Sequence, residues 1–287
     1  MPNKDGFFMF IIEILKSIIL GIVEGITEWL PISSTGHMIL LDEFLQLDVS
    51  QEFLEMLLVV IQLGAICAVP VLFWDRLWPL TSKKSVAEKK GVIGLWGKVI
   101  VGALPAAILG FLFDDLLDKY LYNYIVVAIA LIVYGIAFIF VEKIKAEKEY
   151  RIENAEEISY VDALKIGSFQ VLSLIPGTSR SGSTILGGML SGVSRQASAE
   201  FSFFMAIPIM LGASGLKILK FILEGFTASG EEIILLLVGI VVSFAVSVFV
   251  IKFLMDFVKR HDFKIFGYYR IVLGLIVLVY FLIKSFV

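Results

Sequence analysis

The chain has 287 residues, of which 59% are hydrophobic and 18% are charged. Soluble globular proteins carry about 25% charged residues, so this composition excludes a water-soluble protein. The apolar residues form uninterrupted blocks of roughly 20, the length that crosses the hydrocarbon core of a bilayer. The formal net charge of −3 is spread over short polar segments, which argues against nucleic acid as a partner. The sequence predicts an all-α polytopic membrane protein.

The first apolar stretch, residues 7–29, is followed by the polar breaker PISSTGH at 31–37 and by a short apolar stretch at 38–41. Proline and glycine interrupt helices, so region 7–41 predicts a re-entrant helical hairpin. Glu13 and Lys16 interrupt the apolar run and no small-residue cleavage site follows. We therefore expect this segment to remain in the mature protein rather than act as a signal peptide.

Six further apolar blocks are each long enough to be a transmembrane helix. They cover residues 53–74, 92–113, 121–141, 201–222, 233–255 and 268–286. The polar segments between the blocks differ in charge. The basic segments are 75–91, 142–159 and 256–267, and the acidic segments are 42–52, 114–120 and 223–231. The positive-inside rule places the basic segments on the cytoplasmic side and the acidic segments outside.

The region between the third and fourth blocks must enter the membrane and return, because both of its ends lie inside. It contains the breaker PGTSRSGS at 176–183, so residues 160–190 predict a second re-entrant hairpin. Pro31 and Pro176 lie 145 residues apart, and Glu24 aligns with Gln170. Residues 1–150 and 160–287 therefore read as two repeats, each with one hairpin and three spans. Three is odd, so the second repeat is inverted relative to the first.

Two carboxylates precede the first breaker. Glu24 and Glu28 are four residues apart, so they project from one helix face. Adjacent carboxylates repel unless a cation or a proton lies between them. A divalent cation with oxygen ligands, Mg²⁺ or Ca²⁺, would satisfy both. The alternative is that they form ion pairs with Arg180 or Lys16.

The first breaker itself carries hydroxyls and an imidazole. Ser33, Ser34 and Thr35 precede His37, which together supply a candidate nucleophile and a candidate base. The second histidine, His261, lies in a basic segment and is expected to be solvated. The single cysteine, Cys67, is expected to be a packed apolar residue.

The second breaker favours an anion that carries several oxygens. Arg180 offers a planar guanidinium suited to phosphate, and a helix that begins near Thr184 directs free N–H groups to the same place. Glycines permit close backbone approach, and hydroxyls add donors. These residues are Gly177, Thr178, Ser179, Ser181, Gly182 and Ser183.

The motifs Glu24-x-x-x-Glu28, Pro31-x-Ser33-Ser34-x-Gly36-His37 and Pro176-Gly177-x-Ser179-Arg180-Ser181-x-x-Thr184 closely resemble those of the undecaprenyl-diphosphate phosphatase family, also known as bacitracin-resistance protein BacA. The resemblance covers nearly the whole chain. It implies hydrolysis of undecaprenyl diphosphate in the bacterial inner membrane, which recycles the lipid carrier for peptidoglycan and confers bacitracin resistance. It also implies that Glu24, Glu28, His37 and Arg180 form the functional core, with Ser34, Ser179 and Thr184 beside them.

Our hypothesis assigns a role to each group of residues. Glu24 and Glu28 hold the divalent cation, Ser34 is the nucleophile and His37 is its base, although His37 itself or an activated water are alternatives. Arg180 holds the diphosphate. The further substrate-binding residues are Ser33, Thr35, Gly177, Thr178, Ser179, Ser181 and Thr184.

Three questions stay open at this point. Inverted repeats with broken helices are typical of transporters, so a carrier or flippase for a phosphate-bearing anion or lipid is the alternative function. The polyprenyl tail needs an apolar groove, for which Phe203, Phe204 and Pro208 are candidates, although ordinary helix packing explains them better. The partners are the polyprenyl substrate and membrane lipids, and a homodimer is possible.

Overall fold

The computed structural model describes residues 4–81, 84–145 and 149–285. Within these ranges the secondary structure is helical, apart from one isolated bridge between Ile152 and Val193. The longer helices are α1 (Lys4–Thr27), α2 (Ser34–Leu45), α3 (Gln51–Val60), α4 (Gln62–Leu72), α6 (Val86–Leu121), α7 (Tyr124–Lys145), α8 (Tyr160–Gln170), α9 (Arg180–Leu190), α10 (Arg195–Leu223), α11 (Gly230–Val258) and α12 (Lys264–Lys284). The short ones are α5 (Trp74–Leu77), η1 (Ala155–Glu157) and η2 (Val171–Leu174). The all-α prediction is confirmed.

Seven helical segments in the described residues are long and apolar enough to cross a membrane. They are Gly6–Thr27, Gln51–Leu72, Val86–Phe113, Tyr124–Lys145, Arg195–Leu223, Gly230–Val258 and Lys264–Lys284. The protein is therefore a multi-pass membrane protein. Six spans were expected, and the seventh is Gly6–Thr27, which we had placed in the first hairpin. Within this helix Glu13 and Lys16 pair with each other at 2.7 Å.

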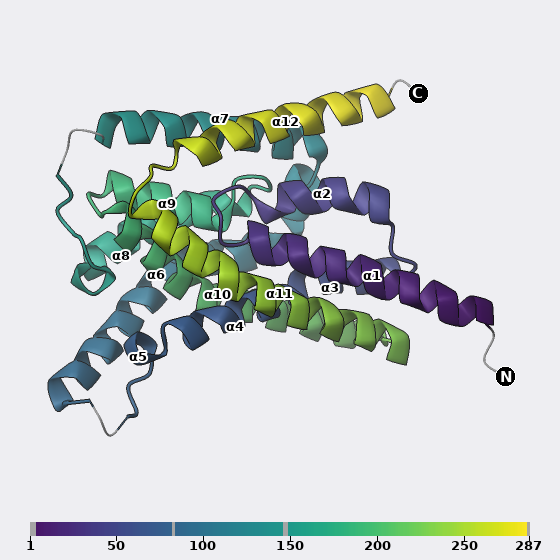
Figure 1. The fold of residues 1–287 in the computed structure, drawn as a ribbon, viewed down its shortest axis with the longest axis horizontal. Coiled ribbons are helices and arrows are strands. Elements are labelled where there is room, and N and C mark those ends of the chain that lie inside the picture. Colours follow the sequence, from purple (N-terminus) through teal and green to yellow (C-terminus); the bar gives the residue numbers. More distant parts are fainter. Residues whose placement is uncertain (1–3, 82–83, 146–148, 286–287) are drawn as a thin grey trace.

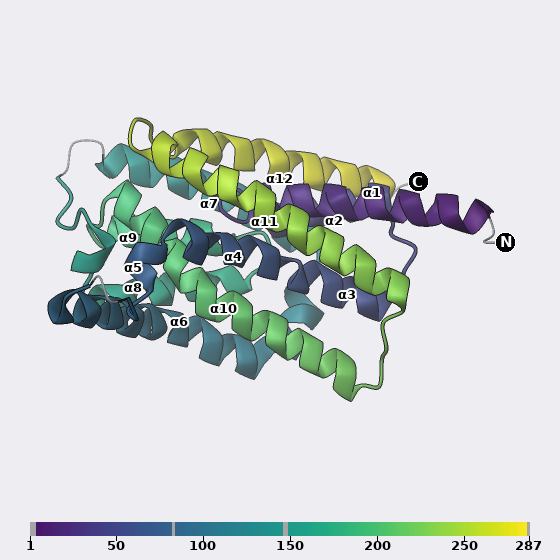
Figure 2. The ribbon, with the colours of Figure 1, turned by 60° about the horizontal axis from the view of Figure 1, so that its bottom comes forward.

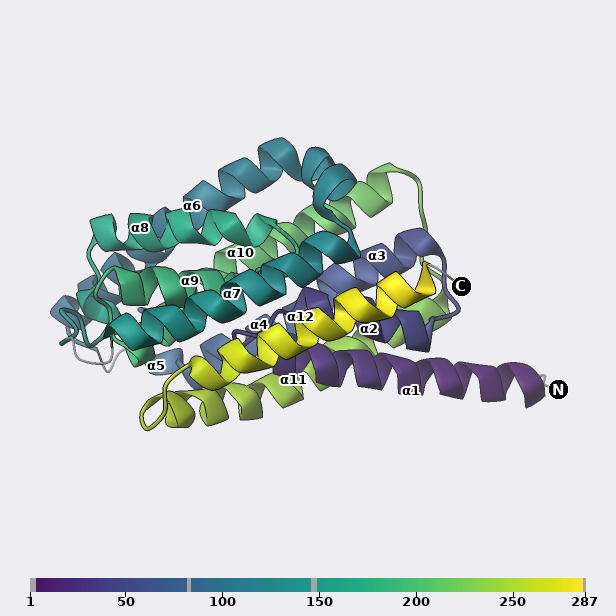
Figure 3. The same ribbon diagram turned by 90° about the horizontal axis from the view of Figure 1, so that it is seen from above.

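The connections between helices divide between the two ends of the bundle in the way that their charges predict (Figures 1 and 3). The basic connections, from α4 to α6, from α7 to α8 and from α11 to α12, lie at one end. The connections from α2 to α3, from α6 to α7 and from α10 to α11 lie at the other. Lys83 and Lys148, which contribute to the charge prediction, lie outside the described residues.

Two antiparallel helix pairs enter the bundle from opposite ends. In Figure 1, α1 runs inward from the right and α2 returns beside it, whereas α8 and α9 come from the left. The turns that join each pair, at 28–33 and 175–179, reach the middle of the bundle. Because both turns lack regular helical hydrogen bonding, they must find their polar partners in each other or in neighbouring side chains.

Close helix crossings hold these pairs in place (Figure 2). A Cβ atom added to Gly21 on α1 would lie 2.8 Å from the Gly239 oxygen on α11, and one added to Gly167 on α8 would lie 2.1 Å from the Gly102 oxygen on α6. Small residues allow membrane helices to approach in this way and gain van der Waals contact. Each hairpin therefore packs on a long helix from the other half of the chain.

Ion pairs brace the basic end of the bundle. Glu142 at the end of α7 is fully buried. It accepts hydrogen bonds from the Arg195 guanidinium on α10, at 2.5–3.0 Å, and from the Phe263 N–H before α12. Arg76 reaches Glu156 and Glu200 at 2.6 and 2.8 Å. These contacts give a structural role to the described part of segment 142–159, for which we had no function.

Two packing predictions have opposite outcomes. Phe203 and Phe204 are fully buried and pack against Trp29 and Phe73, so helix packing accounts for them and they do not line a groove open to lipid. Cys67, expected to be packed, is exposed on α4. The reason is that α4 buries its other faces against α11 and α10, which leaves Cys67 on the outer surface.

Candidate active site

The two turns share an unusual backbone conformation. Ser33 and Ser179 both have positive φ angles, 72° and 76°, which residues with a side chain rarely adopt. Each caps the helix that follows by accepting a hydrogen bond from the backbone N–H three residues on, at Gly36 and Gly182. Such strain costs about 1–3 kcal/mol at each residue and concentrates at functional sites.

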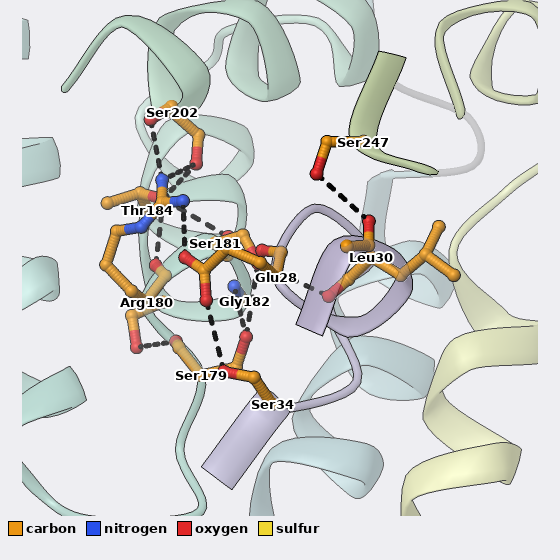
Figure 4. Close-up of polar contacts among 12 residues, drawn as sticks. Glu28, Leu30, Ser34, Ser179, Arg180, Ser181, Gly182, Thr184, Ser202 and Ser247 are labelled. Carbon is orange, nitrogen blue, oxygen red and sulfur yellow. Dashed lines mark hydrogen bonds and ion pairs between the residues drawn. The ribbon is translucent and has the colours of Figure 1, made fainter. Parts of the chain in front are cut away.

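Arg180 connects the two turns (Figure 4). Its Nη2 donates to Glu28 Oε1 at 2.9 Å, and its Nη1 donates to the Ser202 carbonyl at 2.8 Å. Its guanidinium carbon lies 5.7 Å from the Trp29 ring centroid. Ser181 adds a second link, because its hydroxyl donates to the Glu28 carbonyl at 3.1 Å. The sequence prediction that the two breakers meet is confirmed by these contacts.

The two carboxylates have different surroundings. Glu28 is paired with Arg180, as one alternative predicted, whereas Lys16 pairs with Glu13 instead of with either site carboxylate. Glu24 is 1% exposed, and its Oε1 atom has no hydrogen-bond partner. An unpartnered buried carboxylate oxygen is costly and needs a proton, a water or a cation.

A divalent cation fits this pair of residues. No group of three or more histidine, cysteine or acidic side chains that could hold a metal occurs in the described part of the chain, so the protein does not form a complete cage there. Mg²⁺, however, is commonly held by one or two carboxylates, with substrate phosphates and waters as the other ligands. The free oxygen of Glu24 suits such a ligand, whereas both oxygens of Glu28 already accept from Arg180 and Ser34, so a cation would share Glu28 with them.

Ser34 lies against Glu28 rather than His37. Its hydroxyl donates to Glu28 Oε2 at 3.1 Å. Both ring nitrogens of His37 are engaged elsewhere: Nδ1 lies 2.7 Å from the Ser33 carbonyl and Nε2 lies 2.7 Å from the Tyr269 hydroxyl. The expected Ser34–His37 hydrogen bond is therefore replaced by a Ser34–Glu28 hydrogen bond.

The remaining predicted residues surround this centre in different ways. Gly177 has a φ of 90°, and a Cβ there would lie 2.5 Å from the Val127 oxygen. The buried Thr178 hydroxyl has no partner, and the Ser179 and Ser181 hydroxyls lie 3.2 Å apart. Thr184 is buried and donates within the protein, 2.6 Å from Ser202 Oγ. Thr35 is half-buried on the first turn of α2.

Three residues at the site escaped the sequence reasoning. Arg270 is fully buried and donates to the Pro31, Gly177 and Thr178 carbonyls at 2.8–3.1 Å, so it holds both turns. A charge inside an apolar block was the available signal for Arg270. Tyr269, the partner of His37, and Ser202, the partner of Arg180, had no signal of their own in the sequence.

Known proteins resemble the chain over nearly its whole length. A family model described as bacitracin resistance protein BacA matches residues 17–276. A protein of Acetivibrio thermocellus named undecaprenyl-diphosphatase is 58% identical over 271 residues, covering 94% of this chain and 98% of its own. Proteins of the same name from Enterococcus faecalis and Streptococcus mutans are 58% and 55% identical. The matches cover 93% and 96% of this chain and 96% and 99% of those proteins, respectively. The chain therefore belongs to the bacitracin resistance protein BacA family.

Proposed function

We propose that the protein is an undecaprenyl-diphosphatase of the bacterial cell membrane. It hydrolyses undecaprenyl diphosphate to undecaprenyl phosphate and inorganic phosphate, which recycles the lipid carrier for cell-wall synthesis and confers bacitracin resistance. The names of relatives up to 58% identical support this activity. The observation that carries it is a pair of hydrogen bonds that share Glu28, one from Ser34 and one from Arg180. They place a hydroxyl, a carboxylate and a guanidinium where the two turns meet.

The architecture that we propose for this site is an inverted repeat of two re-entrant hairpins, with the repeats at 1–150 and 160–287. Several pairs of contacts support it. Ser33 and Ser179 have the same conformation and the same capping role. Two helix crossings also recur in corresponding places. In the first pair, Gly21 approaches the Gly239 backbone and Gly167 approaches the Gly102 backbone. In the second pair, Gly135 approaches the Gly267 backbone and Gly274 approaches the Ala128 backbone.

The second turn binds the diphosphate in this proposal. Arg180 presents a cation beside the reacting hydroxyl, and it is held in place by Ser202 and Glu28. The positive end of helix α9 begins at the same residue and favours anions. The hydroxyls of Thr178 and Ser179 offer further donors to the phosphate oxygens, whereas the Ser181 hydroxyl already donates to the Glu28 carbonyl.

The chemical step begins at Ser34. As the Ser34 oxygen forms a bond to the terminal phosphorus, its proton passes to Glu28 Oε2, and the bridging P–O bond breaks with its electron pair on undecaprenyl phosphate. Water then attacks the phosphoserine, the P–O bond to Ser34 breaks, and Glu28 returns its proton to the Ser34 oxygen as inorganic phosphate leaves. His37, three residues after Ser34 on the same helix, is the base for that water. A divalent cation bound by Glu24 and Glu28 would neutralise the charge that accumulates on the phosphate oxygens.

The proposal is tested by phosphate release from undecaprenyl diphosphate by the purified protein in detergent. We expect release that is abolished by EDTA, restored by Mg²⁺ or Ca²⁺, and lost in Glu24→Ala. The matched control is Glu55→Ala, which removes an acid that is 54% exposed at the side chain and far from the turns. No release from a folded sample supplied with metal would overturn the proposal and favour a transporter of phosphate-bearing anions or lipids.

A further inference from the structure

Helix α12 presents two neighbouring side chains to the paired turns. Arg270 is fully buried, and its three hydrogen bonds to Pro31, Gly177 and Thr178 fix α12 against both turns at once. Tyr269, directly before it, is therefore held at a defined position beside helix α2. Its side chain is 45% exposed, but its hydroxyl reaches His37.

The contacts of His37 determine which ring nitrogen carries the proton. The Ser33 carbonyl, 2.7 Å from Nδ1, can only accept a hydrogen bond, so Nδ1 is the protonated nitrogen. In the neutral ring Nε2 then carries the lone pair, and the Tyr269 hydroxyl donates to it at 2.7 Å. The two rings are also nearly parallel, with an interplanar angle of 7° and centroids 5.6 Å apart. One tyrosine thus fixes both the plane of the imidazole and the direction of its lone pair.

We propose that Tyr269 is a positioning residue for the phosphatase reaction: together with the Ser33 carbonyl, which sets the Nδ1–H tautomer, its hydroxyl holds the His37 ring in one orientation with Nε2 as the unprotonated nitrogen. The proposal rests on the proposed function, in which His37 deprotonates the attacking water. The χ2 torsion of histidine has a broad, roughly two-fold profile. Without Tyr269 the Ser33 carbonyl still orients the ring through Nδ1, but Nε2 loses the hydrogen bond that ties it to α12.

Nitrogen NMR on ¹⁵N-histidine-labelled protein tests the tautomer independently of activity. The chain has two histidines, and the exposed His261→Gln substitution leaves the His37 ring as the one remaining signal source. We expect one protonated and one unprotonated ring nitrogen in this background, and a shifted Nε2 signal in Tyr269→Phe, because Nε2 then lacks its hydrogen bond. Tyr268→Phe is the matched control, because Tyr268 is the adjacent tyrosine and is 57% exposed. Unchanged His37 signals in Tyr269→Phe would overturn the proposal.

Kinetics test the consequence for the reaction. Tyr269→Phe is expected to lower kcat about 10- to 100-fold, within the range of general-base catalysis, with KM changed less than about twofold. The same substitution in a His37→Ala background is expected to cause no further loss, because the two residues act as one unit. Tyr268→Phe should keep its activity. Full, independent losses in the double variant, or a change confined to KM, would contradict the positioning role. An inactive wild-type protein with the expected NMR signals would instead count against the proposed function.

Discussion

The Glu28 carboxylate and the Arg180 guanidinium, 152 residues apart in the chain, form an ion pair of 2.9 Å that joins the two hairpins. Their side chains are only 7% and 11% exposed. A buried pair of this kind contributes little net stability, but the loss of either partner leaves an uncompensated charge. Because Ser34 donates to the same carboxylate, the proposed nucleophile, its proposed base and the arginine proposed to bind phosphate come together only when both halves of the chain are folded together.

The geometry of Arg180 predicts that lysine cannot replace it. Two separate nitrogens of Arg180 reach Glu28 and Ser202 while the guanidinium lies over Trp29, and a single ammonium group cannot make all three contacts. We expect Arg180→Lys to lower kcat/KM for undecaprenyl diphosphate by about 100-fold, comparable to the loss of one charge-stabilising donor. The change in kcat/KM is measured from the rate of phosphate release at saturating metal.

Arg151→Lys is the matched control for this substitution, because Arg151 pairs with Asp162 in the same half of the chain but is 59% exposed at its side chain. Exposed ion pairs contribute about 0–1 kcal/mol, so its activity should stay near that of the wild type. Equal losses in the two variants would show that arginine identity at the site has no special role.

Substitution of Glu24 is expected to affect stability and activity in different ways. Its Oε1 atom is buried without a partner, so a charge on this group is unfavourable in the folded apoprotein, and Gln removes the ionisable group at nearly constant volume. We expect Glu24→Gln to keep or raise the thermal unfolding temperature in metal-free detergent while phosphate release falls at least about 100-fold. Glu55→Gln should change neither quantity. A lower unfolding temperature in Glu24→Gln would mean that the carboxylate stabilises the fold.

The proposed role of Ser34 predicts a covalent phosphoserine intermediate. If its oxygen attacks the terminal phosphorus, substrate labelled in the terminal phosphate should leave label on the protein after an acid quench. We expect labelled protein with the wild type and none with Ser34→Ala. Glu28→Gln should slow labelling by about 10²- to 10⁴-fold, the contribution of a general base. Ser168→Ala, which removes an exposed hydroxyl on α8, should label normally. Phosphate release without label on any variant would replace Ser34 by a direct attack of water.

Much of this arrangement is readable from the sequence, because it depends on long-range rules of composition. The length of the apolar blocks predicts the spans, and the alternating charge of the connections predicts at which end of the bundle each connection lies. The two proline-containing breakers predict where the helices are interrupted. The pairing of Glu28 with Arg180 follows once the breakers lie together, since buried charges need partners. Helix α1 is also long and apolar enough to cross a membrane, and block length alone does not distinguish such a span from one arm of a hairpin.

Finer contacts depend on backbone angles that local patterns do not predict. A positive φ at Ser33 precedes helix α2, on which Ser34 bonds to Glu28 and His37 to Tyr269, whereas the short spacing of Ser34 and His37 suggested that they would bond to each other. Arg270 was overlooked because it lies close to a basic segment, where the positive-inside rule accounts for an arginine without any site.

Helix crossings predict a contrast between two glycines that have equal helix propensity. A Cβ on Gly64 would lie 2.0 Å from the Ile240 backbone oxygen, where α4 crosses α11, whereas a Cβ on Gly212 of α10 meets nothing within 4 Å. We expect Gly64→Ala to destabilise the protein by about 1–3 kcal/mol or more, as overpacking does, because backbone cannot move aside as a side chain can. Gly212→Ala should be neutral or stabilising by up to about 1 kcal/mol, since alanine is the better helix former. Thermal unfolding in detergent compares the two variants directly. Equal unfolding temperatures would show that α4 and α11 separate freely, and the close contact between the halves of the chain would then not be needed to hold the two turns together.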